Sequence, residues 1–359
     1  MKITYLLGAG ASEQALPIVR NLSDSILSLN RRLNSLLVDS SHPTELSQFV
    51  PDAINNKVFV RKIIDELNLL SQKNEEFNTI DTYAKYLYLT EDPYLNKLKK
   101  YISIYFILHQ LIFHKYIHHN DQGPFIKLDK RYLSFIVSAM SNKAFPTDIK
   151  ILTWNYDFQI EIAGEYFRNE KFEYTENNVT YHLPLINYWP RIGKLEIIDI
   201  PKYYQIYHLN GIAGLNFLNS NQNFVNSIFD LSKNIEYERE IFTNIQNFIN
   251  DGQLLFHFAW EKSELFEDIS DEEAKQDLIH HLNESEIMVI IGYSFPFFNR
   301  LIDKQIFENF LQFSNSKKIY YQNINNDSEK LYEQFNFTKS TADIKFVGHT
   351  NNFFIPHDF

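Results

Sequence analysis

The sequence contains no cysteine among its 359 residues. This absence excludes disulfide bonds, thiolate nucleophiles and every zinc site that uses cysteine ligands. Basic side chains are also in deficit, because 34 lysine and arginine residues stand against 45 aspartate and glutamate residues, a formal net charge of −11. Since an acidic surface repels a phosphate backbone, we expect no direct nucleic-acid binding.

Long apolar runs are missing as well. The longest, at residues 102–113, is interrupted by His109 and Gln110 and is too short to span a bilayer. The first predicted strand begins at residue 3, which leaves no room for a signal peptide ahead of it. We therefore expect a soluble, cytoplasmic protein that does not associate with membranes.

Aromatic side chains, by contrast, are abundant. The chain has 31 Phe and 22 Tyr, and hydrophobic residues make up 44% of it. This is enough apolar material to offset the conformational entropy of folding, so a disordered chain is excluded. A chain of this length is expected to form one elaborated domain or two.

The first twelve residues predict a buried strand that runs into a glycine turn. The strand is Ile3-Thr-Tyr-Leu-Leu7 and the turn is Gly8-Ala9-Gly10-Ala-Ser12. A helix beginning there would offer unpaired N–H groups and the positive end of its dipole to a pyrophosphate. Glu13 stands where the dehydrogenase fingerprint G-x-G-x-x-G has its third glycine, so hydride transfer is disfavoured. A plain tight turn remains the alternative.

Apolar periodicity predicts helices and strands in two blocks. In the first block we expect helices at 22–37, 58–70, 80–89, 94–117 and 131–140, with a proline-containing loop at 39–52. In the second block we expect strands at 149–153, 203–208, 287–291, 318–324 and 344–347, and helices at 158–167, 225–231, 237–248, 271–284 and 300–313. This pattern predicts an α/β fold in which residues 1–24 and 146–359 form one domain and residues 25–145 a helical insertion.

Four of the predicted strands end in polar or glycine-rich loops. These loops are Gly8 to Ser12, Thr153 to Asp157, His208 to Gly211, and Gly292 to Ser294. In an open parallel sheet, the carboxyl ends of the strands meet at one edge, where ligands bind. The loops are therefore expected to form one site. The alternative is that Asn155 and Asp157 are turn or helix-cap residues and that His208 is a hydrogen-bonded core residue.

The order and character of the four loops resemble the bacterial branch of the sirtuin-like family, which contains NAD-cleaving proteins of anti-phage defence. The first loop is similar to the pyrophosphate turn of that family, and the second to its T-x-N-Y-D segment. The fourth matches its late G-x-S turn. The resemblance covers roughly residues 1–25 and 145–350, and it implies a Rossmann-like parallel sheet of sirtuin type with a large helical insertion.

The resemblance also implies roles for particular residues. The pyrophosphate turn is formed by Gly8, Ala9, Gly10 and Ser12, with Pro17 and Arg20 in the cofactor loop; Thr153, Asn155 and Asp157 lie beside the nicotinamide ribose; and Gly292, Ser294 and Asn323 or Asn325 serve the other half of NAD. The histidine of the family immediately precedes a glycine, whereas here Asn210 precedes Gly211 and His208 stands two residues earlier. Since residues i and i+2 of a strand share a face, His208 or Asn210 fills that place.

Hydrolysis of NAD would give nicotinamide and ADP-ribose, and it suits these side chains. The pyridinium leaving group needs little acid catalysis, so the protein must hold the ring, stabilise an oxocarbenium-like ribose and place a water. Asn155 can orient the carboxamide or the water, Asp157 can supply negative charge, and His208 can act as the base. The four-cysteine zinc module of deacylating sirtuins cannot form here, so we expect no metal, and deacylation falls behind NAD hydrolysis.

An unregulated NAD hydrolase would drain its own cell. By resemblance, we therefore expect an abortive-infection effector that is gated by homo-oligomerisation or by a partner protein, with the helical insertion as the gate. Two other functions remain open. One is a non-catalytic regulatory subunit that binds NAD or ADP-ribose, which the asparagine at position 210 suggests. The other is an ADP-ribosyltransferase that uses the same site.

Overall fold

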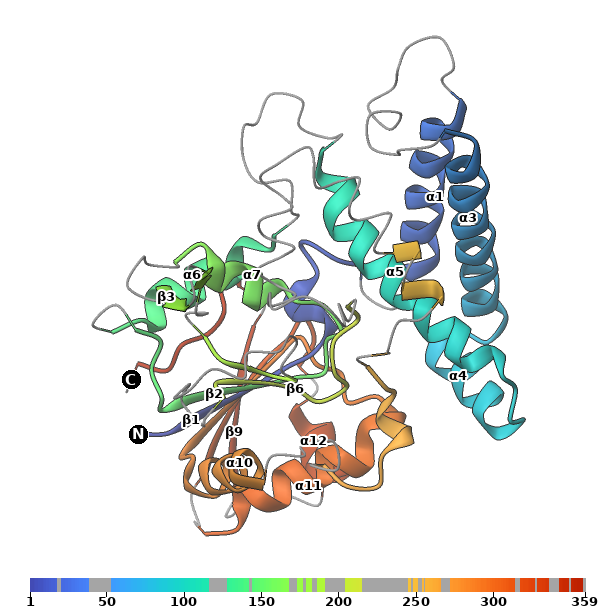
Figure 1. Cartoon of the computed structure of the whole chain (residues 1–359). Coiled ribbons are helices and arrows are strands. Elements are labelled where there is room, and N and C mark those ends of the chain that lie inside the picture. The colour runs from blue at the N-terminus through green and yellow to red at the C-terminus, as the bar shows by residue number, and fades with distance from the viewer. Residues whose placement is uncertain are drawn as a thin grey trace.

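The structure, a computed structural model, describes most of the chain. The described residues are 1–17, 21–38, 53–115, 128–141, 144–167, 173–176, 179–182, 186–190, 204–214, 245–246, 248–250, 254, 256–265, 272–313, 317–326, 328–335, 342–348 and 350–357. Within this part of the chain, a seven-stranded parallel sheet is flanked by helices on both faces, as Figure 1 shows. The fold is α/β and Rossmann-like, as the sequence predicts.

The sheet has the strand order β5-β6-β2-β1-β7-β8-β9. Its strands are β1 (Ile3–Leu7), β2 (Ile149–Thr153), β5 (Tyr188–Trp189), β6 (Ile206–His208), β7 (Ile287–Ile291), β8 (Lys317–Gln322) and β9 (Ala342–Val347). The central strand β1 pairs in parallel with β2 on one side and with β7 on the other. The strand order therefore reverses between β1 and β7, and ligands of such sheets bind at the carboxyl ends of the strands at this point.

The central strands bury both of their faces. Alternate residues of a strand point to opposite faces, so Ile3, Tyr5 and Leu7 join one apolar core while Leu6 joins the other. On the first face lie α6 (Lys130–Ala139) and α7 (Gln159–Glu165), and on the second lie α10 (Glu272–Glu284), α11 (Arg300–Leu311) and α12 (Ser328–Gln334). Burial on both faces explains why these strands read as continuous apolar runs in the sequence.

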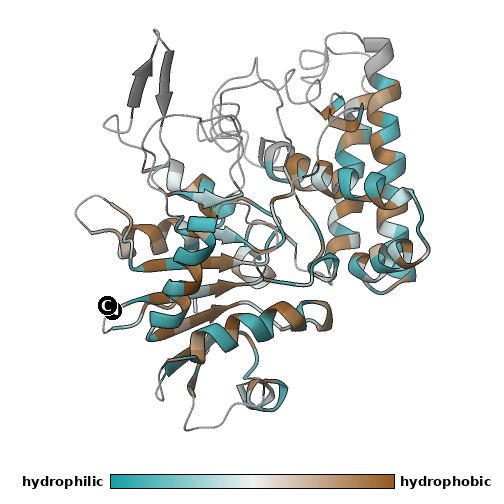
Figure 2. Ribbon diagram, turned by 60° about the horizontal axis from the view of Figure 1, so that its bottom comes forward, coloured by the Kyte–Doolittle hydropathy of each residue, from teal (hydrophilic) through white to brown (hydrophobic). Residues whose placement is uncertain are grey.

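Between β1 and β2 the described chain is helical. It forms α1 (Leu22–Val38), α3 (Ala53–Glu76), α4 (Ile80–Leu89), α5 (Tyr94–Lys115) and α6. The first four extend away from the sheet (Figure 1). Hydrophilic and hydrophobic residues alternate along them (Figure 2). That residues 25–145 form an insertion separate from the sheet domain stays a prediction. No helix among the described residues is long and apolar enough to cross a membrane.

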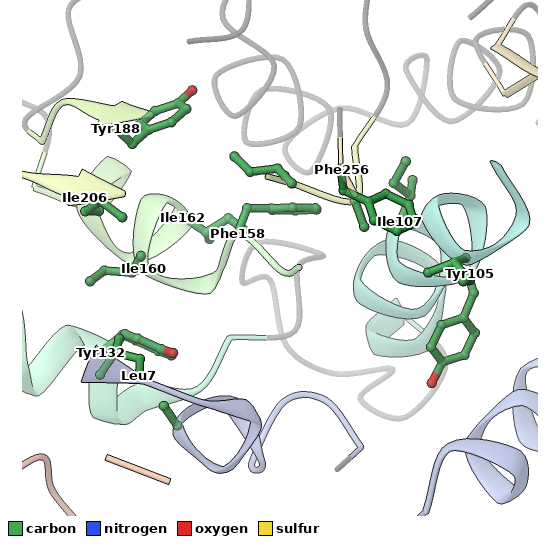
Figure 3. Packing of buried hydrophobic residues seen from close by; sticks show 14 of the residues in the cluster. Leu7, Tyr105, Ile107, Tyr132, Phe158, Ile160, Ile162, Tyr188, Ile206 and Phe256 are labelled. Atoms are coloured by element: carbon green, nitrogen blue, oxygen red, sulfur yellow. The ribbon is translucent and has the colours of Figure 1, made fainter. Parts of the chain in front are cut away.

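The core on the first face continues from the sheet into these helices. Figure 3 shows Leu7 of β1 and Ile206 of β6 together with Ile162 of α7 and Ile107 of α5, all of them members of one buried cluster. Phe256, which precedes the short helix η4 (Ala259–Glu261), belongs to the same cluster. The helices are thus fixed against the carboxyl edge of the sheet by shared apolar packing.

Some elements differ from the predicted ones. The helix expected directly after the first glycine turn is a short 3-10 helix, η1 (Ala9–Ser12), and the strand expected at 203–208 is confined to β6. Sequence periodicity missed β5, α12 and the antiparallel pair β3 (Glu173–Glu176) and β4 (Val179–His182). A helix is present at residues 245–246 and 248–250, while the one predicted at 225–231 and the loop at 39–52 lie outside the described residues.

Candidate functional site

The turns after β1 and β7 are in direct contact. The N–H of Gly8 donates to the oxygen of Ile291 at 3.0 Å, and the N–H of Gly10 donates to the oxygen of Gly292 at 2.9 Å. A Cβ on Gly292 would lie 2.4 Å from the carbonyl carbon of Gly10, and Gly292 has a positive φ of 60°. Glycine is required here because the two backbones touch.

This contact corrects one expectation about the first turn. Sequence reasoning predicted unpaired N–H groups that would bind a pyrophosphate. In the structure, Gly8 and Gly10 donate to the neighbouring turn, and the N–H of Ala11 donates to the oxygen of Gly8 at 2.9 Å. Ala9 is exposed at the tip of the turn and Ser12 is buried beneath it. The three bonded N–H groups therefore shape the turn.

Helix α6 clamps the same turn from the side. Arg131 donates through Nη2 to the oxygens of Gly10 and Ala11, each at 3.2 Å, and pairs with Asp129 at 2.6 Å. The hydroxyls of Tyr132 and Ser12 lie 2.9 Å apart. Asp129 accepts from the N–H of Gln14 at 3.2 Å and caps α6 through Arg131 N. Sequence reasoning missed this clamp, whose residues are far from the turn in sequence.

The segment after β2 reaches the turn from the other side. Asn155 donates through Nδ2 to Ser12 Oγ at 3.2 Å, and its own N–H donates to Thr153 Oγ1 at 3.1 Å. Asn155 and Thr153 are buried. The structure therefore brings together Ser12, Thr153 and Asn155, as predicted from the positions of these residues at strand ends.

Asp157 lies in the same buried group. Its Oδ1 accepts from the N–H of Gln159, the first residue of α7, at 3.1 Å. Burial raises the pKa of the Asp157 carboxyl to about 6, although the hydrogen bonds from Gln159 and Ser12 lower it. A carboxyl with this pKa changes its protonation state close to neutral pH, as an acid–base group must.

His208, at the end of β6, is held through both ring nitrogens. Nδ1 lies 3.2 Å from the main-chain oxygen of Asn155, and Nε2 lies 2.5 Å from Glu161 Oε1 on α7. The side chains of His208 and Glu161 are each 1% exposed. Burial lowers the pKa of His208, but the charge and hydrogen bond of Glu161 more than offset it, so the pKa is raised overall. Glu161 was not among the residues singled out from the sequence.

Asn210 follows His208 and faces a different set of partners. Its Nδ2 donates to Tyr156 Oη at 3.3 Å, and its main-chain oxygen accepts from the N–H of His257 at 2.9 Å. Its Oδ1 is buried and accepts no hydrogen bond from the described residues. Gly211 has a positive φ of 71°, which lets the chain turn there. Of the two residues considered for the histidine position, His208 is the one that bonds to Asn155.

The remaining predicted residues lie at neighbouring strand ends. Ser294 is exposed on the turn after β7, and Asn323 after β8 donates to Tyr321 Oη at 2.6 Å. Pro17 is half-buried beyond the first turn, while Arg20 lies outside the described residues. In the part of the chain that the structure describes, no group of three or more His, Asp or Glu side chains is arranged to hold a metal ion.

On the second face of the sheet, aromatic residues from two of the predicted site loops donate hydrogen bonds to one buried carboxyl group. Asp303 Oδ1 accepts from Trp154 Nε1 at 3.0 Å, and Asp303 Oδ2 accepts from Tyr293 Oη at 2.7 Å. Burial raises the pKa of Asp303 to about 8. Trp154 and Tyr293 belong to the loops after β2 and β7, so Asp303 links the two loops through hydrogen bonds.

Asp303 makes stability depend on pH in a defined direction. Its pKa is about 3.9 in an unfolded chain, so between that pH and about 8 the folded protein holds a proton that the unfolded chain has lost. The free energy of unfolding therefore falls as pH rises through this range, by about 1.4 kcal/mol per unit of raised pKa. In urea titrations from pH 5 to 8, Asp303→Asn is expected to become progressively more stable relative to wild type. If the free energies of unfolding of the two proteins changed with pH in the same way, this prediction would be wrong.

No protein-family model, curated protein or solved structure matches the chain. The site is one buried constellation at the carboxyl ends of β1, β2 and β6, built from Ser12, Asn155, Asp157, Glu161 and His208.

Proposed function

We propose that the chain is a sirtuin-like NAD hydrolase that cleaves the bond between nicotinamide and ribose. The observation that carries the proposal is the hydrogen-bonded constellation of Ser12, Asn155 and His208, with Asp157 beside it. Its residues come from three neighbouring strands, and it stands next to the point where the strand order reverses. Dinucleotides bind at this place in Rossmann-like sheets.

The chemistry of the cleavage fits the side chains present. When the C1′–N bond breaks, its electron pair leaves with nicotinamide, and positive charge develops on the ribose. The carboxylate of Asp157 is held close to this charge in a buried setting, where electrostatic stabilisation is strong. Asn155 is fixed by Ser12 and Thr153, so its amide can orient the carboxamide or the attacking water.

Gating also belongs to the proposal. Lys99 of α5 pairs with Glu261 of η4 at 2.6 Å, and the ring of Tyr88 on α4 lies 5.1 Å from that of Trp260. Lys262, which follows η4, donates to the oxygen of Leu209 beside the site at 2.6 Å. The helices between β1 and β2 thus contact a segment that holds a site loop. A partner protein or a second copy that binds these helices would have a route to that loop.

The test is direct. Purified protein is incubated with NAD, and nicotinamide and ADP-ribose are followed by chromatography. Asn155→Ala is expected to lower the rate of nicotinamide release at least about 100-fold. His208→Ala should also lower this rate, because it removes the hydrogen bond to the main-chain oxygen of Asn155. The exposed residues Asn326 and His280 supply matched controls, and Asn326→Ala and His280→Ala should keep wild-type rates.

Other outcomes would identify a different function. NAD binding without release, even after addition of cell extract, would overturn hydrolysis and favour a non-catalytic regulatory subunit. Label transferred from NAD to a protein or nucleic acid would identify an ADP-ribosyltransferase. Release that survives Asn155→Ala would contradict the site proposed above.

A further inference from the structure

Glu161 makes a contact that the proposed reaction does not require. It projects from α7, and its Oε1 lies 2.5 Å from Nε2 of His208 in surroundings that leave each side chain 1% exposed. Its other oxygen, Oε2, is buried and accepts no hydrogen bond from the described residues. Burying a carboxylate is costly unless a positive partner compensates it. The partner that the described residues offer is His208.

The acceptors on either side of the ring bear on where its protons lie. A main-chain carbonyl oxygen only accepts hydrogen bonds, so Nδ1 of His208 must carry a proton to bond to Asn155. A carboxylate likewise only accepts, so a bond from Nε2 to ionised Glu161 needs a second proton on the ring. With both bonds made, His208 is an imidazolium with no lone pair left to accept a proton.

We propose that Glu161 is a positioning residue that holds His208 as a double hydrogen-bond donor, so that His208 fixes the main chain of Asn155 and Asp157 takes the proton of the attacking water. This inference rests on the proposed NAD hydrolysis for its second half. The first half, the stabilisation of protonated His208 by Glu161, does not depend on any reaction.

The proton balance of the hydrolysis is complete in this scheme. The C1′–N bond breaks and nicotinamide leaves with the electron pair. The water oxygen then forms a bond to C1′, and one water proton passes to the carboxylate of Asp157, which returns it to solvent. His208 keeps both of its protons throughout.

The charged and titratable groups around the ring come from several elements. Asp157 on the loop after β2 and Glu161 on α7 both act on His208, and Tyr132 of α6 is close enough for its own pKa to respond to Asp157. His208 lowers the pKa of Asp157 and Glu161 raises it. Because these two influences oppose one another, replacing the ion pair with a neutral pair should leave the titration of Asp157 nearly unchanged.

The first measurement reads the protonation of His208 without any substrate. Protein labelled with ¹⁵N histidine is titrated by NMR, and the His208 signals among the 12 histidines are assigned by their loss in His208→Gln. An ordinary histidine loses its second ring proton with a midpoint at about pH 6.5. In wild type, we expect both ring nitrogens of His208 to remain protonated above that pH. In Glu161→Gln, burial is no longer offset, so the midpoint should fall below 6.5. A neutral His208 at pH 6.5 in wild type would overturn the proposal, and so would equal midpoints in the two proteins.

The second measurement reads which group accepts the proton. In wild type, kcat/KM for nicotinamide release should rise with pH around a midpoint near 6, the pKa of Asp157. Glu161→Gln should lower kcat about tenfold or more because Asn155 is less well held, with a smaller effect on KM and a midpoint within about half a pH unit of wild type. Glu161→Asp, which keeps the charge, should recover part of the rate.

The outcomes separate the two proposals. If the activity midpoint in Glu161→Gln falls together with the NMR midpoint of His208, then His208 is the base and the inference is wrong. If no variant or wild-type protein releases nicotinamide, the proposed function fails and the assignment of the proton to Asp157 fails with it. The NMR titration still decides whether Glu161 holds His208 protonated.

Discussion

Replacing Gly292 with alanine is expected to lower the free energy of unfolding by about 2–5 kcal/mol. The positive φ of 60° costs an L residue about 1–2 kcal/mol. The added Cβ would lie 2.4 Å from the carbonyl carbon of Gly10 and 2.5 Å from the nitrogen of Ala11, which forces the two turns apart at a further cost of about 1–3 kcal/mol. Urea unfolding followed by circular dichroism measures the loss.

Gly348 offers a matched control. A Cβ built on it meets no atom within 4 Å, so Gly348→Ala should change stability by less than about 1 kcal/mol. If Gly292→Ala were as stable as Gly348→Ala, the contact between the turns after β1 and β7 would not be present in solution.

Replacing Arg131 with alanine is expected to cost about 3–5 kcal/mol, the usual loss when one partner of a buried ion pair is removed. Asp129 is fully buried, and the substitution leaves its carboxylate without its cation. The oxygens of Gly10 and Ala11 also lose a donor. Since these oxygens belong to the turn that places Ser12 against Asn155 of the proposed site, NAD affinity measured by calorimetry should weaken in Arg131→Ala protein that remains folded.

Two further variants make this prediction specific. Arg131→Lys keeps the charge but cannot reach Asp129 and two carbonyls at once, so its stability should lie between wild type and Arg131→Ala. Arg300 is exposed and stacks its guanidinium 5.3 Å from the ring centre of Phe297, so Arg300→Ala should cost less than about 1 kcal/mol. Equal losses for Arg131→Ala and Arg300→Ala would show that the clamp of α6 on the turn contributes nothing.

The strands of the sheet could be predicted because burial on both faces leaves a local signal. β1, β2 and β7 are each five residues long, and all five residues of each strand are buried. β5 could not be found in the same way, since its two residues depend on pairing with β6. The pair β3 and β4 did leave a signal, two runs rich in tyrosine, threonine and valine separated by Asn177 and Asn178.

The site divides along the same line. Ser12, Asn155 and Asp157 could be predicted from position, because polar residues at the ends of parallel strands must meet at one edge. Arg131 and Tyr132 could not, because they act on a turn about 120 residues away. Glu161 lies in the first turn of α7, whereas Asp157 precedes the N-cap Phe158, so helical spacing gave no signal that joins the two carboxyls.

The position of β1 in the sheet has a consequence for how the protein is made. Its neighbours β2 and β7 begin at residues 149 and 287, so one hydrogen-bonding edge of Ile3–Leu7 stays open until β2 is made and the other until β7 is made, when most of the chain has left the ribosome. Pairings this distant in sequence close slowly, and an apolar strand with open edges is prone to aggregate. We therefore expect the first strand to need protection during synthesis, while the helices that follow β1 can form from local contacts.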